Sequence, residues 1–206
     1  MTLLEKIESA FVEFVGKIKW KLTDPVTDSE KEEVRKLLTP NYYIILTRNN
    51  NHISTYFISL GDFLLGRGWS YWGHALMNME DEVKDDNDFR LIESTAKGVH
   101  LSTFDDVFAV NSVAILKPKN MKAEDWTAVF EQALSDVGKP YDNLLQIDQT
   151  NSFSCVELIR NALMADADYM TNFPNFEAMV QKYKRITPQM FYDCKDLEVV
   201  YEVRHK

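Results

Sequence analysis

One cysteine lies where a thiol could be activated for nucleophilic attack. Cys155 is near the start of a predicted helix, residues 154–166, after the polar stretch DQTNSFS. A helix N-terminus carries partial positive charge, which favours the thiolate, and the thiolate is the reactive form. A cysteine that stands alone in a helix is more often a small buried apolar side chain. Cys155 is therefore a candidate nucleophile only if a base lies beside it.

Two predicted strands supply a base and a carboxylate that could orient it. His74 opens the strand 74–80, directly after Gly73, and Glu93 lies on the strand 88–95. If these strands pair antiparallel, imidazole and carboxylate can meet on one face, and the carboxylate would hold the ring in one tautomer. Spacing alone leaves a structural alternative open, in which His74 is a core histidine and Glu93 a solvated carboxylate.

The remaining histidines are weaker candidates for a base. His52 falls in a predicted hairpin, His100 in a predicted loop after KGV, and His205 in the tail. The cysteines and histidines also lack the paired ligand spacing of a zinc site. We therefore expect no metal site and no cofactor.

The length and composition of the chain indicate one ordinary globular domain. The chain has 206 residues, of which 45% are hydrophobic and 27% charged, with a net charge of -9 and a pI near 5.0. This acidity argues against nucleic acid or an anionic membrane as a partner. Part of it lies in EDEVKDDND, residues 80–88, which we interpret as a solvated loop; a metal-binding loop is the alternative. Two cysteines are too few for a disulfide framework.

No targeting or membrane-spanning segment is expected. Charged residues interrupt the N-terminal stretch MTLLEKIESAFVEFVGKIKWKL, so it does not form the apolar region of a signal peptide. No apolar run reaches the ~18 residues of a transmembrane helix. We expect a cytoplasmic protein, or a virion-associated one if it comes from a phage.

The hydrophobic pattern predicts a helical N-terminal extension over residues 1–39 and a mixed domain over 40–206. In the extension, residues 3–20 have helical periodicity, and Thr27 and Glu30 have the spacing of a capping box. In the domain, strands are predicted at 42–47, 52–59, 61–66, 74–80, 88–95, within 106–118, and at 196–204, and helices at 123–138, 154–166 and 174–185. Strands grouped before helices favour an α+β fold over a βαβ series.

Several short segments, taken in order, resemble one family. GDFLLGRG, WGHALMNME, LIESTAKGV, SVAILKP, GKPYD, SCVELI and ITPQMF occur in this order between about residues 60 and 195. This order resembles the circularly permuted NlpC-type branch of the papain-like cysteine hydrolases, which is related to lecithin–retinol acyltransferase. The resemblance implies an antiparallel sheet or partial barrel that carries the histidine and the glutamate. Helices pack against it, and the cysteine lies at a helix N-terminus.

Carried over to this sequence, the resemblance implies a role for each matching residue. Cys155 becomes the nucleophile, His74 the base and Glu93 the orienting carboxylate. Tyr141, together with Ser154, is expected near the substrate or the oxyanion. The motif positions Asp62, Glu157 and Pro188 are expected to be structural. Val156 stands where the family usually has serine, a position at which the backbone N–H could still serve.

The implied activity is cleavage of an amide bond, with cell-wall peptide as the substrate class. One alternative is a lipid acyl hydrolase or acyltransferase, for which Trp69, Tyr71 and Trp72 in RGWSYWG would form an apolar rim; Trp72 is then a substrate-contacting residue. The aromatic residues could equally be packing or a sugar-stacking surface. A second alternative is a catalytically weak component of a larger assembly, such as a phage particle, with a protein partner bound through the N-terminal helices.

Overall fold

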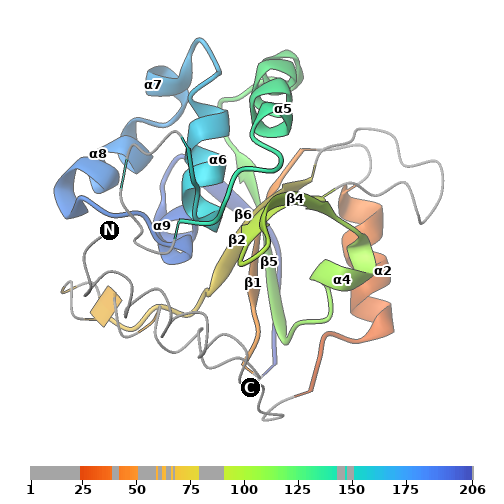
Figure 1. Ribbon diagram of the computed structural model, residues 1–206. Coiled ribbons are helices and arrows are strands. Elements are labelled where there is room, and N and C mark those ends of the chain that lie inside the picture. Colours follow the sequence, from red (N-terminus) through yellow and green to blue (C-terminus); the bar gives the residue numbers. More distant parts are fainter. Residues whose placement is uncertain are drawn as a thin grey trace, which may run out of the picture.

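A six-stranded antiparallel sheet forms the centre of the protein, with helices on both faces (Figure 1). The structure is a computed structural model, and it describes residues 24–38, 42–50, 59, 62–63, 66, 68–78, 91–142, 147 and 151–205. The predicted helix at 3–20 and the acidic stretch 80–88 lie outside these residues. Within them, no helix has both the length and the apolar character needed to cross a membrane.

The strands follow the spatial order β4-β3-β2-β1-β5-β6, and every neighbouring pair is antiparallel. Their bounds are Ile44–Arg48 (β1), His74–Asn78 (β2), Leu91–Thr95 (β3), Gly98–Ser102 (β4), Ser112–Pro118 (β5) and Leu197–Arg204 (β6). The α+β class is thus confirmed, and so are five of the predicted strands. The last strand, β6, joins the sheet beside β5 although helices separate the two in sequence.

The helices divide between the two faces of the sheet. Their bounds are Asp28–Leu38 (α2), Phe104–Val107 (α4), Trp126–Ser135 (α5), Cys155–Leu163 (α6), Tyr169–Asn172 (α7), Pro174–Tyr183 (α8) and Pro188–Asp193 (α9), with a 3-10 turn Ala123–Asp125 (η1) before α5. Helices α5 to α9 lie on one side of the sheet, and α2 and α4 on the other (Figure 1). The predicted helices at 123–138, 154–166 and 174–185 correspond to α5, α6 and α8.

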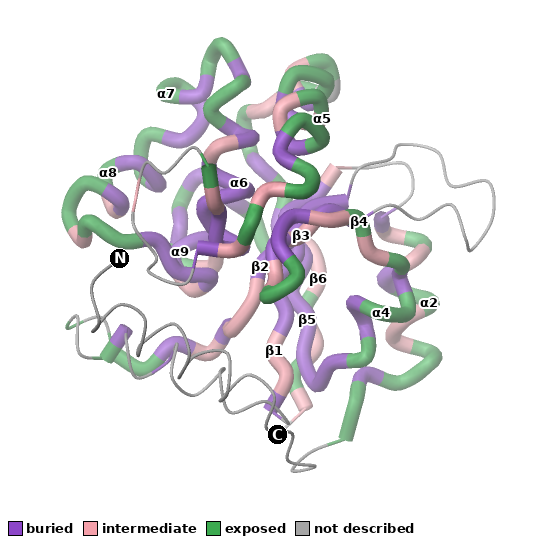
Figure 2. The backbone as a smooth tube through the Cα atoms, in the orientation of Figure 1, coloured by how far each residue is buried: buried purple, intermediate pink, exposed green. Residues whose placement is uncertain are grey.

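Alternate strand residues therefore enter two different cores, because successive side chains of a strand point to opposite faces. Ile44 and Leu46 pack with α5 and α6, whereas Ile45 packs with α2 and α4. All three are wholly buried, and Figure 2 shows β1, β2 and β5, the central part of the sheet, as largely buried. A sheet covered on both faces holds its strands, and the functional side chains on them, in defined positions.

Helix α2 begins as the sequence predicts. Thr27 Oγ1 accepts a hydrogen bond from the backbone N–H of Glu30, and Thr27 N donates to Glu30 Oε2 at 2.7 Å, which together form a capping box. Val34 and Leu38 are fully buried against the sheet. The division of the chain at residue 39 stays a prediction.

Two local predictions are wrong, and a third falls outside the described residues. Strand β1 pairs with β2 on one edge and with β5 on the other, while 52–59, the second strand of the predicted hairpin, lies outside the described part except for Ser59. The strand predicted at 61–66 is not one, since Asp62 and Phe63 are helical. His100 is not in a loop but on β4. His100 joins the sheet because β4 pairs with β3, a contact that the local pattern does not record.

Gly98, at the start of β4, lies against the segment that leads toward the nucleophile candidate. Its φ is +87°, and a Cβ there would lie 2.4 Å from the carbonyl oxygen of Lys139. Backbone bonds join the two segments, from Val99 N to Lys139 O at 2.8 Å and from Gly138 N to Val99 O at 2.9 Å. Only glycine therefore allows this close approach.

We expect Gly98→Ala to lower the free energy of unfolding by more than the ~1–2 kcal/mol that a left-handed alanine costs by itself, because the Lys139 backbone must also move. Gly138→Ala is the matched control, since Gly138 has a φ of +90° with nothing within 4 Å of a Cβ. Urea unfolding of both variants measures the difference. Equal losses would contradict the steric argument.

Candidate active site

Helix α6 presents Cys155 as its first residue. Ser154 is the N-cap: its Oγ accepts from Glu157 N at 3.4 Å, and its own N–H donates to Glu157 Oε2 at 2.9 Å. This capping box fixes the start of the helix. Cys155 is 6% exposed and Ser154 is 1% exposed. The structure thus places Ser154 in the helix cap, and the nucleophile candidate at the positive end of a nine-residue helix.

Hydrogen bonds to neighbouring segments hold the residues before Cys155 in place. Ser94 Oγ, on β3, donates to the carbonyl oxygen of Phe153 at 2.6 Å. Phe153 N donates to Pro140 O at 3.1 Å, and Phe153 forms a parallel bridge with Tyr141. The start of α6 is therefore bound both to the sheet and to the segment that carries Tyr141.

His74 and Glu93 meet as the sequence analysis anticipated. Strands β2 and β3 pair antiparallel, with Met77 opposite Ile92, and His74 Nε2 lies 2.7 Å from Glu93 Oε2. A carboxylate only accepts hydrogen bonds, so Nε2 carries the proton. The His74 side chain is 27% exposed and that of Glu93 is 12% exposed. The carboxylate thus selects one tautomer of the ring.

The second nitrogen of His74 is left for Cys155. Since Nε2 is occupied by Glu93, Nδ1 is the ring atom available to the sulfur, and the charge of Cys155 acts on this ring. Burial alone would lower the pKa of His74. Negative charge and the hydrogen bond at Cys155, followed by the hydrogen bond and charge of Glu93, outweigh burial and raise this pKa to about 10. The arrangement therefore favours an imidazolium beside the sulfur.

Glu93 is held by more groups than the sequence indicated. Burial alone would raise its pKa, but the hydrogen bond and charge of His74, the hydroxyl of Ser102 and the charge of His100 lower it to about 2. The local sequence pattern predicts a loop where β4 lies, so it does not indicate that Ser102 and His100 reach Glu93. A turn at Ala96 and Lys97 would have indicated that 91–102 is a β-hairpin, in which residues from both strands share a face.

Tyr141 is held near the sulfur as a neutral phenol. Its pKa is raised, first by burial and then by negative charge at Cys155, Glu157 and Asp142. Burial also raises the pKa of Glu157 to about 7, although its bonds with Ser154 favour the ionised form, and Asp142 raises it further. Burial thus favours the neutral form of the carboxyl at the start of α6, which limits its repulsion of a thiolate.

The aromatic segment 69–72 does not form one surface. Trp72 is wholly buried and packs edge-to-face on Tyr71, so the expectation that it contacts substrate is corrected. Trp69 is 65% exposed and stacks on Phe63, with ring centroids 4.9 Å apart. Alternation of burial along the segment separates side chains that the sequence places together.

The other cysteine differs from Cys155. Cys194 is buried, its thiol donates to Asp196 Oδ2 at 3.4 Å, and burial, with the Asp196 charge, raises its pKa to about 12. Among the residues that the structure describes, no group of three or more histidine, cysteine, aspartate or glutamate side chains is arranged to hold a metal ion.

Comparisons with known proteins bear on the fold and the family of this chain. The solved structures include the metalloprotein yiiX of Escherichia coli O157:H7, which is similar over 81% of this chain and 98% of its own, with a TM-score of 0.55 and 14% identity. At that identity the similarity concerns the fold. The search of curated proteins gave no match.

A family match identifies the chain more closely. Residues 43–201 match the permuted papain-like amidase enzymes of the YaeF/YiiX type, the C92 family. The match confirms a papain-like cysteine amidase or peptidase, while the NlpC-type and acyltransferase connections stay predictions. With most of its length matched, and with a cysteine at a helix start beside a histidine on a strand, the chain belongs to the C92 family of permuted papain-like amidases.

Proposed function

We propose that this hydrolase cleaves an amide bond through a thioacyl-enzyme, with Cys155 as nucleophile, His74 as base and acid, and Glu93 as orienting carboxylate. One observation carries the proposal: the imidazole of His74 bonds Glu93 through Nε2, and Cys155, at the start of α6, acts on the same ring. This is the relation that nucleophile, base and orienting group require in a catalytic triad.

The proposed reaction begins with a thiolate–imidazolium pair. The proton of the Cys155 thiol resides on Nδ1 of His74, and the thiolate attacks the carbonyl carbon of the amide. His74 then gives this proton to the leaving amine as the C–N bond breaks, leaving an acyl group on the sulfur. In the second half, His74 takes a proton from water, the hydroxide attacks the thioester, and the thiol is regenerated with release of the acid.

Two groups are proposed to stabilise the oxyanion. The first-turn N–H groups of α6 have no partner within the helix, and those at Cys155 and Val156 lie beside the attacking sulfur. Tyr141 stays protonated because its pKa is raised, so its hydroxyl is available as a donor. Removal of one such donor typically costs about 2.7–4 kcal/mol of the activation barrier.

For the substrate we propose a peptide amide, with cell-wall peptide as the class that the family resemblance favours. The amidase family supports the amide bond. A screen that offers a muropeptide mixture beside a phospholipid vesicle distinguishes an amidase from a lipid acyl hydrolase. Release of new amino groups from the muropeptides supports the proposal, and release of fatty acid in their place overturns the substrate assignment.

Thiol labelling tests the proposed nucleophile without a known substrate. The wild-type protein is treated with iodoacetamide at pH 6 to 8, and mass spectrometry resolves the rates at Cys155 and Cys194. We expect rapid labelling at Cys155, because it lies at a helix N-terminus beside His74, the setting in which reactive cysteines occur. Cys194 is the internal control and should label slowly, because burial raises its pKa to about 12.

The same labelling in His74→Ala shows whether the histidine is responsible. We expect the rate at Cys155 to fall toward that of an ordinary thiol, and the rate at Cys194 to stay unchanged. Equal labelling rates at both cysteines in the wild type would refute the assignment. So would a labelling rate at Cys155 that stays high in His74→Ala.

A further inference from the structure

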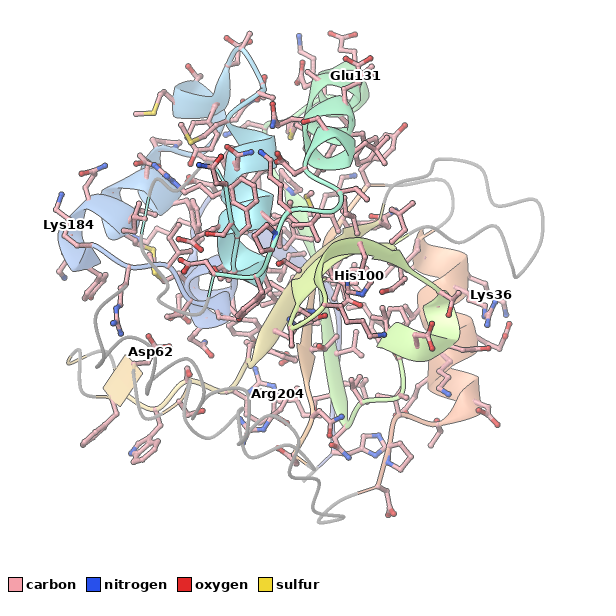
Figure 3. The ribbon with its side chains drawn as sticks, in the orientation of Figure 1. Lys36, Asp62, His100, Glu131, Lys184 and Arg204 are labelled. Carbon is pink, nitrogen blue, oxygen red and sulfur yellow. The ribbon has the colours of Figure 1, made fainter. Side chains whose placement is uncertain are left out.

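The β3–β4 hairpin brings two side chains to the carboxylate of Glu93 that lie outside the proposed triad. Glu93 pairs directly with His100, and Leu91 with Ser102, across the two strands. Residues two apart on a strand share a face, so Glu93, His100 and Ser102 lie on the same side of the hairpin. Figure 3 labels His100 on this hairpin, near the centre of the view.

The two oxygens of Glu93 have separate partners. Oε2 faces His74, as described above. Oε1 accepts a hydrogen bond from the hydroxyl of Ser102 and lies 3.5 Å from Nε2 of His100. A carboxylate that is 12% exposed needs partners for both oxygens, because an unpaired buried acceptor costs free energy.

His100 is itself oriented by the backbone. Its Nδ1 lies 2.8 Å from the carbonyl oxygen of Gly98. The carbonyl can only accept, so Nδ1 carries the proton and Nε2 is the atom directed at Glu93. Protonation of Nε2 therefore places an imidazolium beside Oε1, and this positive charge favours the ionised carboxylate.

We propose that Ser102 and His100 are positioning residues, which hold Oε1 of Glu93 so that Oε2 stays directed at His74. The inference rests on the proposed function, because it assigns their effect to the orientation of the catalytic imidazole. A carboxylate bound at one oxygen only can rotate about its last side-chain torsion. A carboxylate bound at both keeps one orientation, and the tautomer of His74 with it.

A matched pair of variants isolates the hydroxyl. Ser102→Val and Ser102→Thr have side chains of nearly the same shape, and only threonine keeps the O–H. Turnover of p-nitrophenyl acetate is measured from pH 5 to 11, with formation of the acetyl-Cys155 adduct followed by mass spectrometry. We expect Ser102→Val to lower kcat roughly 10–100-fold, the effect typical of residues that orient a functional histidine, with little change in KM.

Two further readouts separate positioning from a general loss of structure. The high-pH limb of kcat/KM should move to lower pH in Ser102→Val, because a misdirected Glu93 stabilises the imidazolium less. Ser102→Thr should keep most of the wild-type kcat, and its kcat/KM should decline at the same high pH as that of the wild type. Leu101→Thr, at an exposed position on the other side of β4, controls for changes to the strand.

A second pair keeps the test decisive if Ser102→Val does not fold. His100→Gln can place an amide N–H where Nε2 lies, and His100→Leu cannot. At the acid end of the pH range, where an imidazolium can donate from Nε2, we expect the leucine variant to lose more kcat than the glutamine variant.

Two outcomes would overturn the inference, and they differ from failure of the proposed function. Folded valine and threonine variants with equal kcat and equal pH profiles would show that the hydroxyl does not position Glu93, and equal His100 variants would show the same for His100. Cys155→Ala is measured alongside: if it retains turnover, the proposed function fails. If it is inactive while the pairs are equal, only the positioning role fails.

Discussion

Cys155→Ala is expected to abolish amide and ester turnover while the protein stays folded. Without the sulfur no thioacyl-enzyme forms, and loss of a nucleophile that acts with its base typically costs roughly 10⁶-fold in kcat. The change removes one small buried side-chain atom, so the free energy of unfolding should fall by only about 1 kcal/mol. Steady-state kinetics with p-nitrophenyl acetate, and urea unfolding of the same samples, measure both quantities.

Cys194→Ala is the matched control for this substitution. Cys194 is also buried, at 3% exposure, but it lies beside Asp196 rather than His74. We expect this variant to keep its activity and to lose some stability. Turnover that survives in Cys155→Ala, or that disappears equally in both variants, would end the nucleophile assignment.

The second large effect is the loss of activity in His74→Ala, with a smaller loss in Glu93→Gln. Alanine removes the proton carrier itself, so kcat should fall about as far as in the cysteine variant. Glutamine keeps the size of Glu93 but removes its charge, and loss of an orienting carboxylate costs up to about 10⁴-fold. Kinetics of the two variants under identical conditions give the order.

The pH profile shows whether Glu93 acts through His74. The reactive pair needs His74 protonated, so activity should decline as pH rises through about 10, where the raised pKa of His74 lies. The sign follows from the ion pair: Glu93 favours the charged imidazolium, so its neutralisation lowers the pKa of His74. The high-pH limb of Glu93→Gln should therefore lie below that of the wild type.

Thr95→Ala is the matched control for the Glu93 variant, because Thr95 lies on the same strand, β3, at its half-buried end. Leu91 is wholly buried, so its substitution would also affect the core. Thr95→Ala should leave kcat unchanged, and activity should decline at the same high pH as in the wild type. If Glu93→Gln is less active than His74→Ala, or if its limb does not move, the roles of the two residues are misassigned.

The sequence was sufficient where the signal is local. Capping-box spacing marked the start of α2, because Thr27 and Glu30 are three residues apart and bond within one turn. Alternating or continuous apolar runs marked the strands that carry His74 and Glu93. The same patterns placed Cys155 at a helix N-terminus, which is a property of the first turn alone.

The sequence was insufficient where one segment depends on another. The run at 52–59 has strand composition, yet β1 takes its partners from β2 and β5, which no local pattern records. Trp69 and Trp72 are three residues apart and differ from 65% exposed to wholly buried. His100 was assigned to a loop because β4 is short and follows a turn directly.

The candidate site shows the same division. The sequence by itself determined the residue types that could react, the helix start that favours a thiolate at Cys155, and the strands that carry His74 and Glu93. Only the tertiary structure decided that Glu93 and Cys155 both act on His74, and that Ser102 and His100 lie at the other oxygen of Glu93. The reason is physical: caps and strands follow from short-range hydrogen bonds and periodicity, whereas the pairing of β2 with β3 and the packing of α6 depend on contacts between residues far apart in the chain.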